Sequence, residues 1–208
     1  MATEVGDRPR QCRVLLSLNE YFRLVGDPDV AIEAGQRALA LATDLDDRPL
    51  QTQASVVLGA TFQRQGNYLD ARETLMRNVR LLTGELNYEQ FGHMNPPSIS
   101  SRTWLVWSLA ELGEFTEGEL RVSEELQIAK TVGFHFGLVH AYFAAGALHL
   151  WKGQLGEAIT ALENGLASCR AGNIAIFFPL TAGSLGYAYA LAGRPRRLSR
   201  CWSRVQNA

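Results

Sequence analysis

Apolar residues recur along most of the chain with the spacing of helices rather than strands. The clearest stretch, residues 54–79, has one apolar helical pattern that runs to Phe62, a break at Gly66 and then a second helical pattern. Gly59 and Ala71 lie on either side of the break, where small side chains allow two antiparallel helices to cross closely. This segment predicts one helix–turn–helix unit.

The same unit repeats along the chain. Turn-forming glycines recur at intervals of 40, 47, 40 and 40 residues, at Gly26, Gly66, Gly113, Gly153 and Gly193. A second small residue follows five positions after each of the first four glycines. Glycine suits the left-handed residue that ends a helix, and the Asp27 and Asn67 that follow two of these glycines are good N-caps for the next helix. Such a regular period predicts a helical repeat array.

The pattern predicts about nine helices and an all-α fold. They cover residues 10–25, 29–45, 49–65, 68–84, 99–112, 115–132, 135–152, 155–171 and 175–192. The extra residues of the 47-residue interval are assigned to a long loop at 84–98, which is rich in turn-forming residues. The β-branched and aromatic run 174–180 also fits a strand, but the phase of the glycines favours a helix. We therefore expect an α-solenoid of antiparallel helix pairs.

Residues Leu58, Gly59, Phe62, Gly66, Tyr68 and Ala71 resemble the tetratricopeptide repeat (TPR) signature. The period of 40 residues is longer than the usual ~34. Segments 35–42, 102–115 and 184–194 are similar to the C-terminal arrays of bacterial signalling proteins that join an adenylate/guanylate cyclase domain to an AAA ATPase. The resemblance spans roughly residues 10–194 and implies a right-handed α-solenoid that serves as a regulatory or protein-binding module. Neither ATPase nor cyclase sequence is present, so it implies neither activity.

The two ends of the chain depart from the repeat. Residues 1–9 are expected to be disordered, residues 10–194 to form the repeat domain, and residues 195–208 to be a basic tail or a truncated last helix. The formal net charge of −1 provides no global basic field, which argues against nucleic acid and membrane partners. There is no signal peptide or membrane-length apolar run, and the three cysteines are far apart, so we expect a cytoplasmic protein without disulfides.

No constellation of residues predicts catalysis, a cofactor or a metal. The chain has no phosphate-binding glycine loop and no serine in a nucleophile-elbow motif. His135, His140 and His149 are spaced by five and nine residues, which places them off a common helical face. Carboxylates such as Glu124 and Glu125 are expected on solvated helix faces. The sequence therefore predicts a protein that is not an enzyme.

Recognition of a partner is the remaining chemistry. In TPR arrays the first helix of each pair lines a concave groove, and the resemblance implies groove positions at Gln63, Arg64, Thr103, Trp104, Trp107, His140, Phe143, Ala147, Trp151 and Tyr187. The first two repeats also present Arg13, Glu20, Arg23 and Gln53, so one end of the groove is polar and the other aromatic. Aromatic side chains and arginine carry much of the binding energy at interfaces. Alternatively, Trp104, Phe143 and Trp151 fill the core of these long helices.

These features predict a scaffold that binds a peptide or protein segment in its groove. The lysines and asparagines with which chaperone-binding members of the family clamp a peptide carboxylate are absent from the corresponding positions, which disfavours that activity. Two alternatives stay open. One is a sensor that binds a small molecule at the aromatic end, and the other is self-assembly through the incomplete C-terminal repeat.

Overall fold

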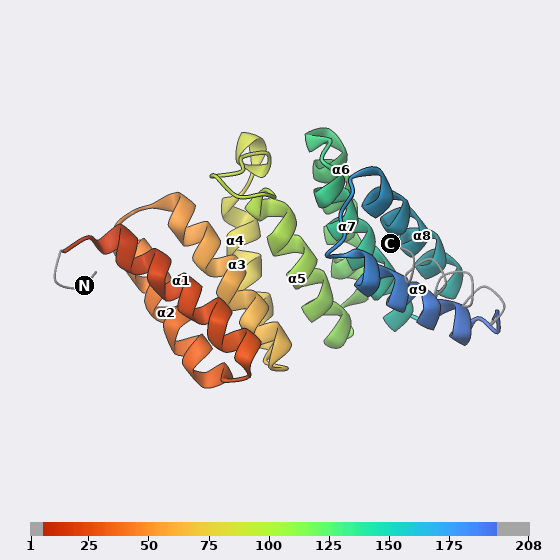
Figure 1. The fold of residues 1–208 in the computed structure, drawn as a ribbon, viewed down its shortest axis with the longest axis horizontal. Coiled ribbons are helices and arrows are strands. Elements are labelled where there is room, and N and C mark those ends of the chain that lie inside the picture. The colour runs from red at the N-terminus through yellow and green to blue at the C-terminus, as the bar shows by residue number, and fades with distance from the viewer. Residues whose placement is uncertain (1–5, 195–208) are drawn as a thin grey trace. The chain divides into compact units, whose positions relative to one another are not determined.

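The structure is a computed structural model that describes residues 6–194, and this range contains helices, turns and loops but no strand. Figure 1 shows the arrangement of these elements within the chain. In order they are α1 (Arg8–Val25), α2 (Pro28–Asp44), α3 (Arg48–Arg64), α4 (Tyr68–Leu81), the short 3₁₀ helix η1 (Gly84–Asn87), α5 (Pro97–Glu111), α6 (Phe115–Val132), α7 (His135–Trp151), α8 (Leu155–Ala171) and α9 (Phe178–Leu191). The all-α fold is confirmed, with each described α-helix close to its predicted place.

Two helix starts differ from the sequence prediction. Helix α1 begins at Arg8, because the side chain of Asp7 accepts a hydrogen bond from the amide of Arg10 at 3.0 Å and caps the helix. The first two residues of α1 therefore belong to the domain and not to the segment expected to be disordered. Helix α9 begins at Phe178 with Pro179 in its first turn, and the residues before it form turns.

The repeated glycines end their helices in the left-handed conformation, as predicted. Their φ angles lie between 66° and 88°. In every case the amide of the residue after the glycine donates a hydrogen bond, at 2.9 Å, to the carbonyl of the residue four positions before the glycine. The amide of Asn67 and the carbonyl of Phe62, on either side of Gly66, are one such pair. Asp27 and Asn67 occupy the N-cap positions that follow, but their side chains make no capping hydrogen bond. Backbone hydrogen bonds already close these turns.

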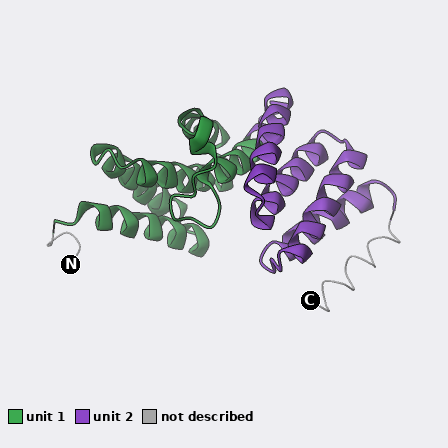
Figure 2. Cartoon of the chain, turned by 90° about the horizontal axis from the view of Figure 1, so that it is seen from above, with its two compact units in different colours: residues 1–108 green, residues 109–208 purple. Residues whose placement is uncertain are grey.

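The chain forms two compact units, residues 1–108 and 109–208, which Figure 2 colours separately. In the N-terminal unit α1 packs on α2, α2 on α3 and α3 on α4. Buried Asn19 joins three of these helices, since its amide group donates to the carbonyl of Ala31 at 2.6 Å and accepts from the hydroxyl of Thr61 at 2.9 Å. Asn78 likewise donates to the hydroxyl of Ser101, at 2.8 Å, and so ties α4 to α5. These buried amides fix the register of the helices.

In the C-terminal unit α6 packs on α7, α7 on α8 and α8 on α9. Close packing depends on glycine here: a Cβ placed on Gly146 would lie 2.5 Å from Cγ of Leu162, which is fully buried. Gly59 faces Leu75 in the same way within the N-terminal unit. No helix in the described part of the chain is both long and apolar enough to cross a bilayer.

Candidate binding site

A cavity of about 730 Å³ opens on the N-terminal unit. It lies between the middle of α1, the first two to three turns of α3 and the loop that follows η1. We call it the N-terminal cavity, and its lining residues are Arg13, Leu16, Ser17, Glu20, Asp47, Pro49, Leu50, Gln53, Val57, Phe91, Gly92 and His93. Apolar side chains from the core form part of its wall, and charged or amide side chains from α1 and α3 form the rest. Such a mixture is typical of recognition sites.

The charged groups of the cavity have different surroundings. The carboxylate of Asp47 caps α3 by accepting a hydrogen bond from the amide of Leu50 at 3.0 Å. Within residues 6–194 the side chain of Arg13 takes part in no ion pair, and it is exposed at the cavity wall. Burial lowers the pKa of His93, because it disfavours the charged imidazolium. The cavity therefore combines the cation of Arg13, the imidazole of His93 and two carboxylates, those of Asp47 and Glu20.

Glu20 connects the cavity to a second group of charged residues. It lines the cavity and forms an ion pair with Arg23, one turn further along α1. The Arg23 side chain is only 13% exposed, and its buried Nε has no hydrogen-bond partner among the described residues. The charges of Arg23 and Glu20 also act on Arg64, at the end of α3. Glu20 and Arg23 on α1 and Arg64 on α3 thus form a group of interacting charged side chains that starts in the cavity, and we call this group the polar strip.

Arg64 reaches from α3 to an aromatic pair on α5. Its Cζ lies 5.4 Å from the centre of the Trp104 ring, a cation–π contact. Trp104 and Trp107 pack edge to face with ring centres 5.1 Å apart. Burial is the main cause that lowers the pKa of Arg64, followed by the positive charge of Arg23, whereas Glu20 acts in the opposite direction. We call Arg23, Arg64 and Trp104 the arginine–tryptophan cluster.

The remaining predicted groove residues of this unit contribute less surface. Gln63 is half-buried, next to Arg64 on α3. Thr103 is only 4% exposed, and its hydroxyl donates to the carbonyl of Ile99 at 3.1 Å inside α5. The structure therefore brings Arg64, Trp104 and Trp107 together and leaves Thr103 in the interior.

Sequence reasoning predicted the loop before α5 but did not predict that it forms a wall of the cavity. Phe91 and Gly92 both adopt positive φ, 49° and 80°, and this sharp turn presents Phe91 and His93 to the cavity. The hydroxyl of Ser98 donates to the carbonyl of Asn87 and ties the two ends of the loop together. The available signal was the extra length of the second repeat interval together with Gly92.

The predicted groove residues of the C-terminal unit occupy several environments. His140 lies between two aromatic rings, with ring centres 4.9 Å from Phe136 and 4.5 Å from Phe177. Burial lowers the pKa of His140 to about 4. Phe143 is 4% exposed, as in the interpretation that it fills the core, and Ala147 is half-buried. Trp151 and Tyr187 are 58% and 60% exposed, so they offer the largest free aromatic surface of this set.

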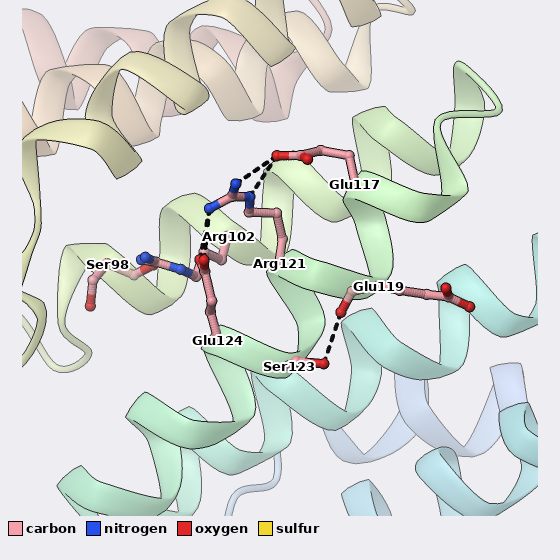
Figure 3. Close-up of polar contacts among 7 residues, drawn as sticks. All are labelled: Ser98, Arg102, Glu117, Glu119, Arg121, Ser123 and Glu124. Carbon is pink, nitrogen blue, oxygen red and sulfur yellow. Dashed lines mark hydrogen bonds and ion pairs between the residues drawn. The ribbon is translucent and has the colours of Figure 1, made fainter.

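Charged side chains on α6 form a separate network, drawn in Figure 3. Arg121 bridges Glu117, at 2.7 Å, and Glu124, at 2.8 Å. On the same helix the hydroxyl of Ser123 donates to the backbone carbonyl of Glu119 at 3.0 Å. Glu125 is fully buried, which corrects the expectation that it lies on a solvated face. Nowhere in residues 6–194 do three His, Cys, Asp or Glu side chains gather as metal ligands would.

Comparison with solved structures identifies the fold. A Rap protein complexed with Competence and Sporulation Factor superposes with a TM-score of 0.80 at 12% identity over 94% of this chain, which spans about half (53%) of that protein. BtubC (BKLC) from P. vanneervenii gives a TM-score of 0.74 at 20% identity, over 98% of this chain and 82% of that one. A Podosopora anserina putative kinesin light chain with nearly identical TPR-like repeats gives a TM-score of 0.71 at 17% sequence identity, over 96% of this chain and 94% of that one.

The chain therefore has a TPR-like helical repeat fold. Comparisons with protein-family models and with curated sequences find no match.

Proposed function

We propose that this protein is a non-enzymatic interaction module that binds a peptide or protein segment on the N-terminal unit, in the N-terminal cavity and along the polar strip beside it. The cavity is the observation that carries the proposal. It is large enough for several side chains, its wall combines apolar surface with Arg13, Glu20 and Gln53, and two helices and a loop hold it open.

Two further observations support a macromolecular partner. The fold is shared with a Rap protein whose structure is a complex with Competence and Sporulation Factor. The polar strip continues from the cavity to the arginine–tryptophan cluster, and arginine and tryptophan are the residue types most often found at energetically important interface positions. The resemblance to cyclase-linked arrays adds that the module serves a larger cytoplasmic signalling protein of bacteria, which the reading frame of the gene would test.

A selection experiment tests the proposal. The full chain would be immobilised and used to select from a library of random peptides displayed on phage, and the selected peptides would be measured by fluorescence anisotropy. Ser17 lines the cavity, and its hydroxyl donates to the carbonyl of Arg13 at 3.1 Å. Ser17→Trp fills the opening and is expected to weaken binding about tenfold or more.

Ser123 provides a matched control. It is also an exposed helical serine whose hydroxyl donates four residues back, at 3.0 Å, and it lies on α6 and does not line the cavity. Ser123→Trp should leave the affinity unchanged, and circular dichroism would show that both variants fold. Gln53→Trp is a second way to fill the cavity. The proposal is wrong if no peptide is enriched, or if both serine variants weaken binding equally.

The size of the cavity also favours a second candidate, a small-molecule sensor. Its volume of about 730 Å³ lies within the range of about 300–1,000 Å³ that is typical of small-molecule pockets. Thermal-shift screening with metabolites separates the two functions. A specific shift at micromolar ligand, abolished by Ser17→Trp, would favour the sensor over the peptide-binding module.

A further inference from the structure

The arginine–tryptophan cluster has more positive charge than its own side chains neutralise. Arg23 and Arg64 are opposed by one carboxylate, that of Glu20, which forms an ion pair with Arg23. Arg64 makes no hydrogen bond and no ion pair within residues 6–194; it contacts the Trp104 ring, and the charges of Arg23 and Glu20 act on it. All five N–H donors of this guanidinium are thus available to a ligand.

The surroundings of Arg64 suit an anionic ligand. Its side chain is exposed, so a ligand can reach it, and an added negative charge would offset the repulsion from Arg23 that contributes to its lowered pKa. The Trp104 ring holds the planar guanidinium in place, which lowers the entropy cost of ordering a flexible side chain on binding. A preorganised guanidinium with free donors can bind a carboxylate, the anionic group of ordinary peptide side chains, through two parallel hydrogen bonds.

Glu20 determines where such an anion would lie relative to the cavity. Because Glu20 lines the cavity and also pairs with Arg23, a segment that fills the cavity must pass beside this carboxylate to reach Arg64. An anionic group close to Glu20 would be repelled, whereas one placed at Arg64 would meet an unpaired cation. The charges of Glu20 and Arg64 thus determine both the sign of the charge that the ligand carries and its position along the segment.

We infer that the ligand is a peptide segment with an aspartate or glutamate side chain, whose carboxylate pairs with Arg64 beside Trp104 while neighbouring residues occupy the N-terminal cavity. This inference rests on the proposed function and names the chemical class of its ligand. The rest of the segment needs no particular charge, because Arg64 is the one arginine of the cluster that has no ion-pair partner within residues 6–194.

The test repeats the phage selection with a charge-reversed chain. Peptides selected by the wild-type chain should carry Asp or Glu at one fixed position. Arg64→Glu should bind those peptides about 10- to 100-fold more weakly, because a charge-assisted hydrogen bond is replaced by repulsion. A fresh selection on Arg64→Glu should replace the acidic residue by Lys or Arg at the same position.

Arg37 provides the matched control, because it is an exposed arginine on α2 that pairs with Glu33 at 3.6 Å and does not line the cavity. Arg37→Glu should leave both the selected sequences and their affinities unchanged. Arg64→Gln is a milder variant that removes the charge if the reversed chain does not fold.

The possible failures are distinguishable. If no cavity-dependent peptide is selected by the wild-type chain, the proposed function itself fails. If peptides are selected and lose affinity with Ser17→Trp, but show no acidic position or no reversal with Arg64→Glu, the function stands and this inference is overturned.

Discussion

At the scale of single residues, glycine at a helix crossing has a sharply defined role. A Cβ on Gly146 would lie 2.5 Å from Leu162, which is fully buried and cannot move aside freely. We therefore expect Gly146→Ala to destabilise the protein by about 1–3 kcal/mol through overpacking. Urea denaturation followed by circular dichroism measures this change.

Gly183 on α9 is the opposite case and serves as the control. A Cβ placed there would meet nothing within 4 Å, and the residue is exposed. Gly183→Ala should stabilise the protein by about 0.8–1 kcal/mol, since alanine has the higher helix propensity. Equal effects of the two substitutions would contradict the view that the packing of Gly146 is specific.

His140 makes stability depend on pH. The pKa of its imidazole is about 4 in the folded chain, against an ordinary value near 6.5 after unfolding. Between these two values the unfolded chain binds more protons, so the free energy of unfolding falls as pH falls from 6.5 to 4 and is insensitive to His140 above that window. At pH 5 the loss relative to pH 7.5 is about 2 kcal/mol.

The variant His140→Phe isolates this contribution, because it keeps a ring against Phe136 and Phe177 and removes the titrating group. Urea unfolding at pH 7.5 and pH 5 should show a smaller pH difference for the variant than for the wild type. An unchanged difference would mean that other groups, such as the carboxylates, account for the acid sensitivity.

At the scale of elements, the start of α3 depends on a single side chain. Asp47 accepts the amide hydrogen of Leu50, so Asp47→Ala should cost about 1 kcal/mol. Asp27 holds the equivalent position in α2 but makes no capping hydrogen bond, and Asp27→Ala should cost clearly less. Thermal unfolding of the two variants under the same conditions compares them directly.

The helices were largely predictable from the sequence, because the residues that end a helix act through their own backbone conformation and that of their neighbours. A glycine such as Gly66 ends its helix wherever it occurs, because the left-handed conformation is a property of that residue and its neighbours. The caps were less predictable, since Asp27 and Asp47 look alike in the sequence and only one of them forms the hydrogen bond. That outcome depends on the backbone geometry of each turn.

At the scale of the whole molecule, the two compact units should respond separately to local damage. In repeat proteins each element is stabilised mainly by its nearest neighbours. Gly146→Ala should therefore speed amide hydrogen exchange most in α7 and α8, and leave the rates in α1 and α2 almost unchanged. Exchange measured by mass spectrometry would contradict this if all described helices accelerated together.

The candidate site was less predictable than the fold, because it depends on contacts between elements that are distant in sequence. The repeat register placed Arg64 and Trp104 among the expected groove positions, but it contained no information that one would lie over the other. It also gave no indication that His93 would line the cavity, since the path of a long loop is determined by tertiary packing. Phe143 and Thr103 share the register and are buried all the same.

The position of Trp104 gives the proposed site an optical reporter of its own. Indole emission responds to a charge near the ring, and Trp104 lies against the guanidinium of Arg64 with Trp107 edge-on beside it. A variant that keeps these two tryptophans and replaces Trp151 and Trp202 by phenylalanine would report a ligand at Arg64 without any attached dye. The cation that recognises the ligand would thus also make its arrival visible as a change in fluorescence.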